Sequence, residues 1–314
     1  MSKLISILIE STGLTERDVM KIISNAPRRY KHFRIKKRNG SLRDIAQPAR
    51  ELKALQKVIV EKYLLELPVH QAAMAYRKGR SIRENALAHV DNGPILKMDF
   101  KEFFPSIRVR DWQAYCEDRS LFMDGDDLHH TSKILFHQSK GESYLKLAIG
   151  APSSPHLSNL LMYKFDALVS QLVQKDYVAY TRYADDLTFS AKRTGYLTGV
   201  EKAVRRAIKE VPWPRLSINE NKTVVATPRY HRQVTGLVLT NDQEVSLGRD
   251  RKRKISAAVH HAKHGELTVE AAARLSGTLA FVNSVEPEFL LRLERKYGRE
   301  VIDNLKQFPW KLEK

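Results

Sequence analysis

Cysteine is almost absent from this chain of 314 residues. The single cysteine, Cys116, excludes an internal disulfide and is more typical of a small core residue than of a nucleophile. No apolar run is long enough to cross a bilayer. The first residues also lack a signal-peptide pattern, because Glu10 and Glu16 interrupt any apolar stretch. We therefore expect a protein of the reducing cytoplasm that has no membrane partner.

Acidic residues are in the minority. The chain has 54 Lys and Arg against 36 Asp and Glu, which gives a formal net charge of +18 at pH 7. Such a charge attracts polyanions, nucleic acid first and anionic membrane second. Basic residues gather at 28–34, where Tyr30 and Phe33 lie among them, and again at 249–254. Phosphate contacts combined with stacking surfaces suit single-stranded or hybrid nucleic acid.

The hydrophobic pattern is helical at the start of the chain, mixed in the middle and helical at the end. Thr15 is a plausible N-cap for a first helix, and Asn39-Gly40 predicts the turn of a basic hairpin. Further along, the pattern predicts a strand at 95–100, mostly helix over 111–145, a helix near 198–210, strands at 216–218 and 234–239, and basic helices from 249 onward.

Two adjacent acids, Asp185 and Asp186, follow Tyr183-Ala184 between two strand-like runs. Adjacent carboxylates repel each other and usually need a cation, although an acidic turn is the simpler interpretation of this segment alone. Asp99 ends another predicted strand. If these strands pair, three carboxylates meet at one sheet edge and suit Mg²⁺. Two such ions would support nucleotidyl transfer.

The tetrapeptide 183–186 resembles the YxDD motif of reverse transcriptases, and other motifs of that family accompany it in order. These are the segments 43–56, 79–82, 96–106, 150–159 and 216–223. The resemblance implies an α+β class and a right-hand polymerase fold. Its parts would be an N-terminal helical segment at 1–30, fingers and palm at 31–245 with an antiparallel sheet carrying the catalytic acids, and a helical, basic thumb at 246–314.

The resemblance also implies roles for individual residues. Asp99, Asp185 and Asp186 would be catalytic and would bind two Mg²⁺ ions, or Mn²⁺ as a substitute, with help from the Phe100 backbone carbonyl. The expected dNTP-binding residues are Lys78, Arg80, Phe104, Gly150 and Lys222; those expected to contact the template and primer are Tyr183, Val234, Thr235 and Gly236. Phe104 would exclude a ribose 2′-hydroxyl, although a core position beside Phe103 is an alternative.

Two elements resemble those of retron reverse transcriptases: Asn85-Ala86-Leu87-Ala88-His89 and Val234-Thr235-Gly236. This branch implies a structured noncoding RNA (msr-msd) as template and primer, a 2′-hydroxyl start, a branched RNA–DNA product (msDNA) and a toxin or effector partner in antiphage defence. Residues proposed to recognise the RNA are Asn85, His89, Lys252, Arg253 and His260.

Two positions depart from the family pattern: Arg77 stands where an aromatic residue is common, and Ile149 stands where a Gln is common. The change at Ile149 leaves the nucleotide contact of that Gln in doubt but does not affect the three acids. The alternatives are another bacterial reverse transcriptase, of the group II intron-like or diversity-generating type, and a noncatalytic RNA-binding protein. The complete set of acids argues against the second.

Overall fold

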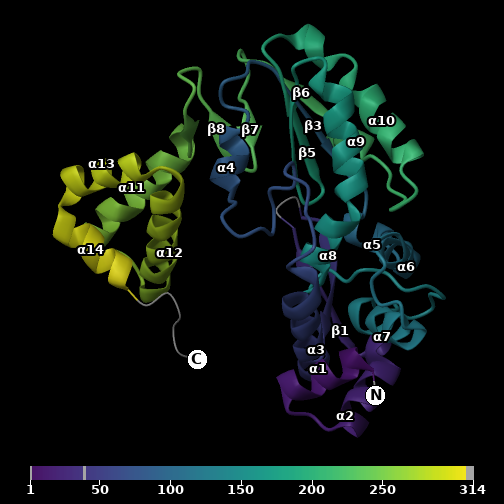
Figure 1. Cartoon of the computed structure of the whole chain (residues 1–314). Coiled ribbons are helices and arrows are strands. Elements are labelled where there is room, and N and C mark those ends of the chain that lie inside the picture. Colours follow the sequence, from purple (N-terminus) through teal and green to yellow (C-terminus); the bar gives the residue numbers. More distant parts are fainter. Residues whose placement is uncertain (1, 38–39, 309–314) are drawn as a thin grey trace. The chain divides into compact units, whose positions relative to one another are not determined.

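The computed structural model describes residues 2–37 and 40–308, which form two compact units (Figure 1). Unit 1 comprises Met1–Gly79, Leu96–Phe189 and Tyr196–Val224. Unit 2 comprises Arg80–Ile95, Ser190–Gly195 and Val225–Lys314. These units do not coincide with the three segments expected from the sequence, since 80–95 and 190–195 group with the C-terminal part. Fingers, palm and thumb boundaries therefore stay a prediction.

Unit 1 opens with two short helices, where the sequence predicted one. The Thr15 hydroxyl accepts a hydrogen bond from the Asp18 backbone N–H at 3.2 Å and caps α2 (Glu16–Asn25), as expected. The preceding α1 (Lys3–Thr12) was not predicted; the Ser2 hydroxyl caps it and Gly13 ends it with a φ of 69°. Leu4 and Leu8 of α1 are fully buried, so this helix belongs to the core.

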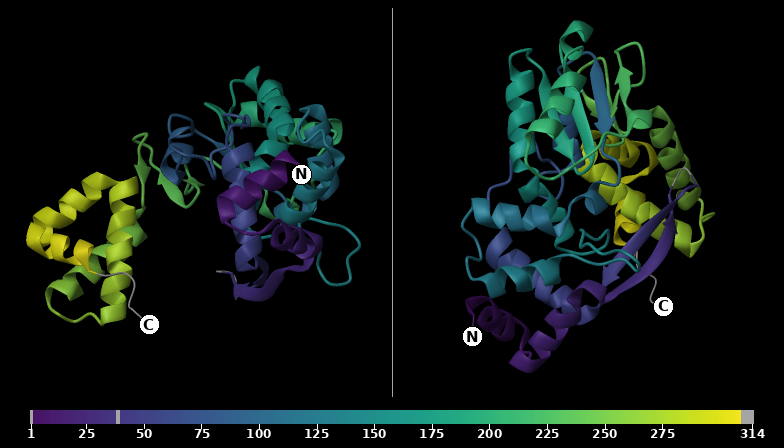
Figure 2. Two further views of the ribbon diagram at one scale, coloured as in Figure 1. Left: turned by 60° about the horizontal axis from the view of Figure 1, so that its bottom comes forward. Right: turned by 90° about the vertical axis from the view of Figure 1, so that its right-hand side faces the viewer.

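A basic two-stranded ribbon follows these helices and is seen from two sides in Figure 2. Its strands are β1 (Tyr30–Lys36) and β2 (Leu42–Pro48), which pair antiparallel from Tyr30 opposite Pro48 to Lys36 opposite Leu42. Six of the seven β1 residues are exposed. This agrees with the basic hairpin expected from the sequence, while Asn39 of the expected turn lies outside the described residues.

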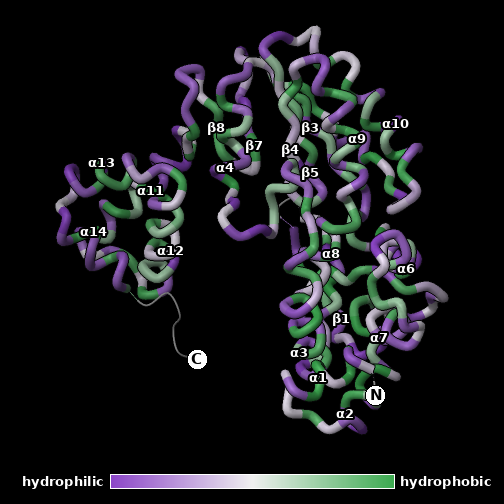
Figure 3. Tube along the Cα trace, viewed as in Figure 1, coloured by the Kyte–Doolittle hydropathy of each residue, from purple (hydrophilic) through white to green (hydrophobic). Residues whose placement is uncertain are grey.

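A four-stranded sheet carries the acids. Its strand order is β4-β5-β3-β6, with bounds β3 (Ile95–Asp99), β4 (Ala179–Tyr183), β5 (Asp186–Ser190) and β6 (Val224–Ala226). Figure 3 shows hydrophobic residues concentrated along β3 and β5. The remaining helices of unit 1 are α3 (Arg50–Ile59), which continues into a π-helical turn, α5 (Phe103–Ser106), α6 (Val109–Asp118), α7 (Gly125–Leu135), α8 (Ser154–Leu161), α9 (Tyr163–Gln174) and α10 (Val200–Glu210).

The prediction of mostly helix over 111–145 holds for α6 and α7, but after α7 the chain leaves the helix and His137 forms a bridge with Lys146. The prediction of a strand at 216–218 was wrong. Only Ile218 forms a bridge, with Phe100, and β6 is the strand that pairs with β3. The apolar pattern at 216–218 was present, but its bridging partner, Phe100, comes from a distant part of the chain.

Unit 2 joins a small sheet to a helical bundle. Its elements are α4 (Ile82–Leu87), β7 (Gln233–Val234), β8 (Leu237–Leu239), β9 (Val245–Ser246), α11 (Arg249–Lys263), α12 (Val269–Val285), α13 (Pro287–Tyr297) and α14 (Arg299–Gln307). One hydrophobic core runs through them and includes Val234, Leu279 and Ile302, each fully buried. The predicted strand at 234–239 is instead a hairpin, since Thr235 and Gly236 have φ of 48° and 80° and connect β7 to β8.

None of the helices within residues 2–37 and 40–308 combines the length and hydropathy needed to span a bilayer.

Acidification should destabilise unit 2 through His89. Its ring is fully buried and accepts or donates a hydrogen bond at 2.7 Å with the Ser190 hydroxyl. Burial lowers the pKa of His89 from 6.5 to about 3. Between these two values only the unfolded state takes up the proton, so the stability present above pH 6.5 is lost as the pH falls. We expect a loss of about 2 kcal/mol in the free energy of unfolding between pH 7 and pH 5.

Urea denaturation of the wild type and of His89→Gln, followed at several pH values, measures this effect. The difference in unfolding free energy between the two proteins should shrink as the pH falls, because the glutamine does not titrate. A difference that stays constant from pH 7 to pH 5 would contradict the prediction.

Candidate active site

Three carboxylates meet where β3 and β5 lie side by side. Asp99 ends β3 and is only 4% exposed, while the partly exposed Asp185 and Asp186 follow the β4 end at Tyr183. The Phe100 backbone N–H donates to the Asp185 carbonyl at 3.2 Å and fixes the two strand ends against each other. Ala184 has a φ of 57°, which gives a tight turn between β4 and β5. The predicted convergence of the acids is therefore present.

Burial and the charges of neighbouring acids disfavour the ionised forms of Asp185 and Asp186. Burial, and then the charge of Asp99, raise the pKa of Asp185 above its usual range. Burial, followed by the charge of Asp185, raises the pKa of Asp186 to about 6, although Lys97 opposes the shift. A cation bound between these carboxylates would favour their ionised forms.

Lys222 provides one positive charge at the site. Its Nζ lies 2.9 Å from both carboxylate oxygens of Asp99, and the Asn219 backbone N–H donates to the Asp99 carbonyl at 2.7 Å. Burial opposes the charged form of Lys222, but its hydrogen bond to Asp99 and the acidic charges outweigh this and raise its pKa. The sequence had placed Lys222 near the nucleotide; the structure also brings it to the acids.

The donor set fits Mg²⁺. Within the described ranges, no group of three or more Asp, Glu, His or Cys side chains is arranged as a formed metal site. The Asp99 oxygens instead contact the Lys222 ammonium, which shows that this position favours a cation. Carboxylate oxygens are the ligands that Mg²⁺ prefers. The Phe100 side chain is buried, with its ring centroid 5.8 Å from that of Phe103, and the metal-binding role of its backbone carbonyl stays a prediction.

A buried ion pair supports the turn between β4 and β5 that carries Asp185. Arg182 on β4 and Asp166 on α9 are both fully buried, with Arg182 Nη2 2.6 Å and Nε 2.8 Å from the two Asp166 oxygens. Arg182 Nη1 donates to the Ala184 carbonyl at 3.2 Å and to Asn159 Oδ1 at the same distance. This network holds the turn that carries Asp185. This network was not predicted from the sequence.

The predicted nucleotide residues of unit 1 lie on separate segments. Phe104 is partly exposed on α5 and its ring centroid lies 5.4 Å from that of the buried Phe103, so the core alternative applies to Phe103 rather than to Phe104. Lys78 is exposed on the loop that leads to α4, and Tyr183 is partly exposed at the end of β4. Arg80, also exposed, begins unit 2.

Gly150 allows its loop to approach strand β2 closely. Its φ is 120°, and an added Cβ would lie 3.0 Å from Ile45 Cγ2 and 3.1 Å from the Ala46 carbonyl oxygen. The Ala46 backbone N–H donates to the neighbouring Ile149 carbonyl at 2.9 Å. Ile149, at the position where the family often has Gln, therefore joins this loop to the basic ribbon through its backbone.

Replacing Gly150 by Ala should destabilise the fold by about 1–3 kcal/mol, because the side chain adds both strain and a clash. Thermal unfolding measures the effect. Gly277→Ala is the matched control, since Gly277 lies within α12 with nothing within 4 Å of an added Cβ. That change should stabilise slightly. Equal melting temperatures for the two variants would contradict the prediction.

The predicted template and RNA residues of unit 2 differ in exposure. Val234, Asn85 and His89 are fully buried, which favours positioning roles over direct RNA contact by their side chains. Gly236 is needed for the β7–β8 turn rather than for close approach of a straight strand. On α11, Arg253 and His260 are exposed, while Lys252 pairs with Glu286 at 2.5 Å.

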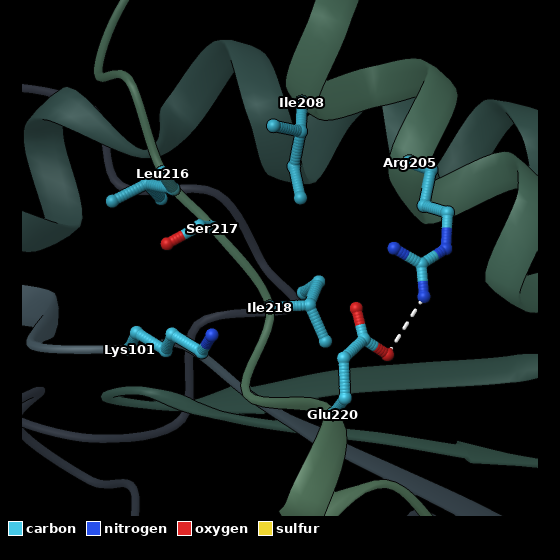
Figure 4. Close-up of a pocket in the computed structure, with 7 residues that line it drawn as sticks. All are labelled: Lys101, Arg205, Ile208, Leu216, Ser217, Ile218 and Glu220. Atoms are coloured by element: carbon cyan, nitrogen blue, oxygen red, sulfur yellow. Dashed lines mark hydrogen bonds and ion pairs between the residues drawn. The ribbon is translucent and has the colours of Figure 1, made fainter.

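A pocket of about 420 Å³ lies beside the segment that leads to Lys222 (Figure 4). Ser217, Ile218, Arg205 and Glu220 line it together with Lys101, and Arg205 and Glu220 are joined by an ion pair of 2.8 Å. None of the predicted site residues lines this pocket. It does not change the assignment of the acidic site.

Residues 35–256 match the family described as reverse transcriptase (RNA-dependent DNA polymerase). Retron Ec83 reverse transcriptase from Escherichia coli is 36% identical over 286 residues, which cover 89% of this chain and 90% of that protein. This chain belongs to the retron-type reverse transcriptases. The sequence-based recognition is confirmed, as are an RNA-directed DNA polymerase activity and the α+β right-hand polymerase fold.

Other similar proteins include Retron Ec86 reverse transcriptase from Escherichia coli, which is 32% identical over 98% of this chain and 92% of that protein. A solved telomerase structure from Candida albicans, in complex with a fragment of telomeric RNA, aligns with a TM-score of 0.48 and 13% identity. The alignment covers 88% of this chain and 60% of the telomerase chain. Membership of the reverse transcriptase family, over residues 35–256, implies action on nucleic acid, in agreement with the net charge of +18.

Proposed function

We propose that this reverse transcriptase copies part of a structured noncoding RNA, the msr-msd RNA, into msDNA. Synthesis begins at an RNA 2′-hydroxyl and yields branched RNA–DNA. The observation that carries this proposal is the convergence of Asp99, Asp185 and Asp186 in a chain that belongs to the retron-type enzymes. A noncatalytic RNA-binding protein would have no need to hold three carboxylates at one sheet edge against their mutual repulsion.

In this proposal, Asp99, Asp185, Asp186 and the Phe100 carbonyl hold two Mg²⁺ ions, and Mn²⁺ is a possible substitute. The bound ions supply charge stabilisation for the attacking hydroxyl and the pyrophosphate leaving group. The Arg182–Asp166 pair keeps the Ala184–Asp185 turn in place. Lys222 leaves Asp99 and contacts the incoming dNTP, whose phosphates attract its ammonium group.

The remaining binding roles are assigned according to whether each side chain is exposed or buried. Lys78 and Arg80 bind the triphosphate, since both side chains are exposed and Arg grips phosphate bidentately. Phe104 contacts the dNTP sugar, and Gly150 shapes the adjoining loop. Tyr183 and the Val234-Thr235-Gly236 turn lie against template and primer. Arg253, His260 and Lys252 contact the RNA from α11, while the buried Asn85 and His89 hold α4 in place.

The proposed setting is the cytoplasm, with the noncoding RNA and its msDNA as constant partners. A toxin or other effector protein completes an antiphage system in this proposal. Absence of a bilayer-spanning helix from the described residues is compatible with it.

The deciding experiment purifies the protein with its bound nucleic acid, adds Mg²⁺ and labelled dNTPs, and sequences the product. We expect metal-dependent DNA synthesis, and a product that keeps a ribonucleotide branch after ribonuclease treatment. A linear product would limit the protein to conventional priming. RNA binding without any dNTP incorporation would overturn the polymerase assignment.

A further inference from the structure

Tyr76 has an unusual backbone conformation close to the acidic site. Its φ is 61°, a left-handed value that costs free energy for a residue other than glycine. Tyr76 is 46% exposed, so burial of its ring offsets that cost only in part. A strained and exposed aromatic residue is a candidate for a functional contact.

Hydrogen bonds on both sides fix the position of Tyr76. The Asn159 side-chain amide donates to the Ala75 carbonyl at 2.8 Å, and the Met74 backbone N–H donates to the Arg182 carbonyl at the same distance. On the other side, Arg77 Nη1 donates to the Ala73 carbonyl at 3.1 Å. Because Asn159 and Arg182 also belong to the network under the acid turn, one buried frame positions both Tyr76 and Asp185.

The Tyr76 ring lies near Phe104, the residue assigned to the dNTP sugar. Its ring centroid is 6.5 Å from that of Phe104, with the rings tilted by 49°. Burial, and then the charges of Asp185 and Tyr183, raise the pKa of its hydroxyl, which places the side chain near the catalytic turn as well. An exposed aromatic ring thus lies close to both Phe104 and the turn that carries Asp185.

We propose that Tyr76 is a specificity-determining residue whose ring contacts the base pair between the incoming dNTP and the template. The proposal rests on the polymerase function proposed above. A ring held in one position offers apolar contact to a correctly shaped base pair, and a displaced mispair loses that contact. Phe104 keeps the separate role of contacting the sugar.

Single-nucleotide insertion on a primed RNA template tests this role. Tyr76→Gly removes the ring and also relieves the strained φ, so the variant should fold at least as well as the wild type. We expect it to raise the KM for the correct dNTP about tenfold and to lower the preference for correct over mispaired dNTP to a similar extent. Tyr76→Asn should behave like Tyr76→Gly, since asparagine tolerates a positive φ. Tyr76→Phe keeps the ring, so its KM and its preference for the correct dNTP should equal those of the wild type.

The matched control is Tyr177→Gly, because Tyr177 has a φ of 53° and is 82% exposed just after α9. Its KM and selectivity should equal those of the wild type. A fall in kcat with unchanged KM in Tyr76→Gly would overturn the inference, as would increased ribonucleotide incorporation equal to that of Phe104→Ala. An inactive wild type would overturn the polymerase function and this inference together, whereas an active wild type with unaltered Tyr76 variants would overturn the inference alone.

Discussion

Asp185→Asn should abolish DNA synthesis while the protein still folds and binds RNA. The asparagine keeps the shape of the side chain but removes the charge that a metal ion needs. We expect a loss of at least about 10³-fold in kcat, or about 4 kcal/mol of transition-state stabilisation. Because burial and Asp99 raise the pKa of Asp185, its charge is unfavourable in the folded protein. The variant should therefore melt at the same temperature as the wild type or slightly higher.

Primer extension and RNA-binding assays on the same preparations measure the two effects separately. Asp242→Asn provides a control that removes the same charge from an exposed turn. It should retain full synthesis. Loss of RNA binding together with synthesis in Asp185→Asn would mean that the acid is structural, and retained synthesis would remove it from the catalytic site.

Asp166→Asn should cause the largest loss of stability, about 3–5 kcal/mol in the free energy of unfolding. Arg182 is fully buried, and its guanidinium would lose the negative charge that compensates it. The same change should loosen the Ala184 carbonyl, which Arg182 holds at 3.2 Å. We therefore expect a lower rate of DNA synthesis even at temperatures at which the variant is still folded. Denaturant unfolding and primer extension at low temperature measure these two losses.

Asp118→Asn breaks a comparable pair in a different environment. Lys164 Nζ lies 2.6 Å from Asp118 Oδ1, but these side chains are 39% and 34% exposed. Water already solvates both charges, so the expected loss is at most about 1 kcal/mol. Similar losses for the two variants would show that the Arg182–Asp166 pair carries no special weight. Adding Arg182→Met to Asp166→Asn should recover part of the lost stability, because it removes the unpaired charge.

The acidic site could be predicted from the sequence, since Asp99, Asp185 and Asp186 each end or follow a short apolar run that reads as a strand. The buried ion pair that supports this site could not be predicted. Arg182 and Asp166 lie on different elements, and their pairing depends on how β4 packs against α9. A signal was nevertheless present: Asp166 precedes Val169 by three residues and Val173 by seven, so it lies on the buried face of α9.

The errors in secondary structure share a physical cause. Residues 234–239 have the composition of one strand, but the left-handed φ values of Thr235 and Gly236 turn the chain back on itself. Asn85 and His89 were expected to recognise RNA from the resemblance of 85–89 to retron enzymes, and both are fully buried in unit 2. Sequence patterns report local preference, whereas burial depends on which distant segments cover a residue.

The single cysteine has a practical consequence for spectroscopy. Cys116 lies on α6 with none of its surface exposed, and burial raises the pKa of its thiol far above neutrality. It should therefore resist maleimide reagents in the folded protein. A cysteine introduced at an exposed position such as Met123, which is 74% exposed, would then be the preferred attachment point for a fluorophore. Site-specific dyes could thus follow template capture in real time without first replacing the native thiol.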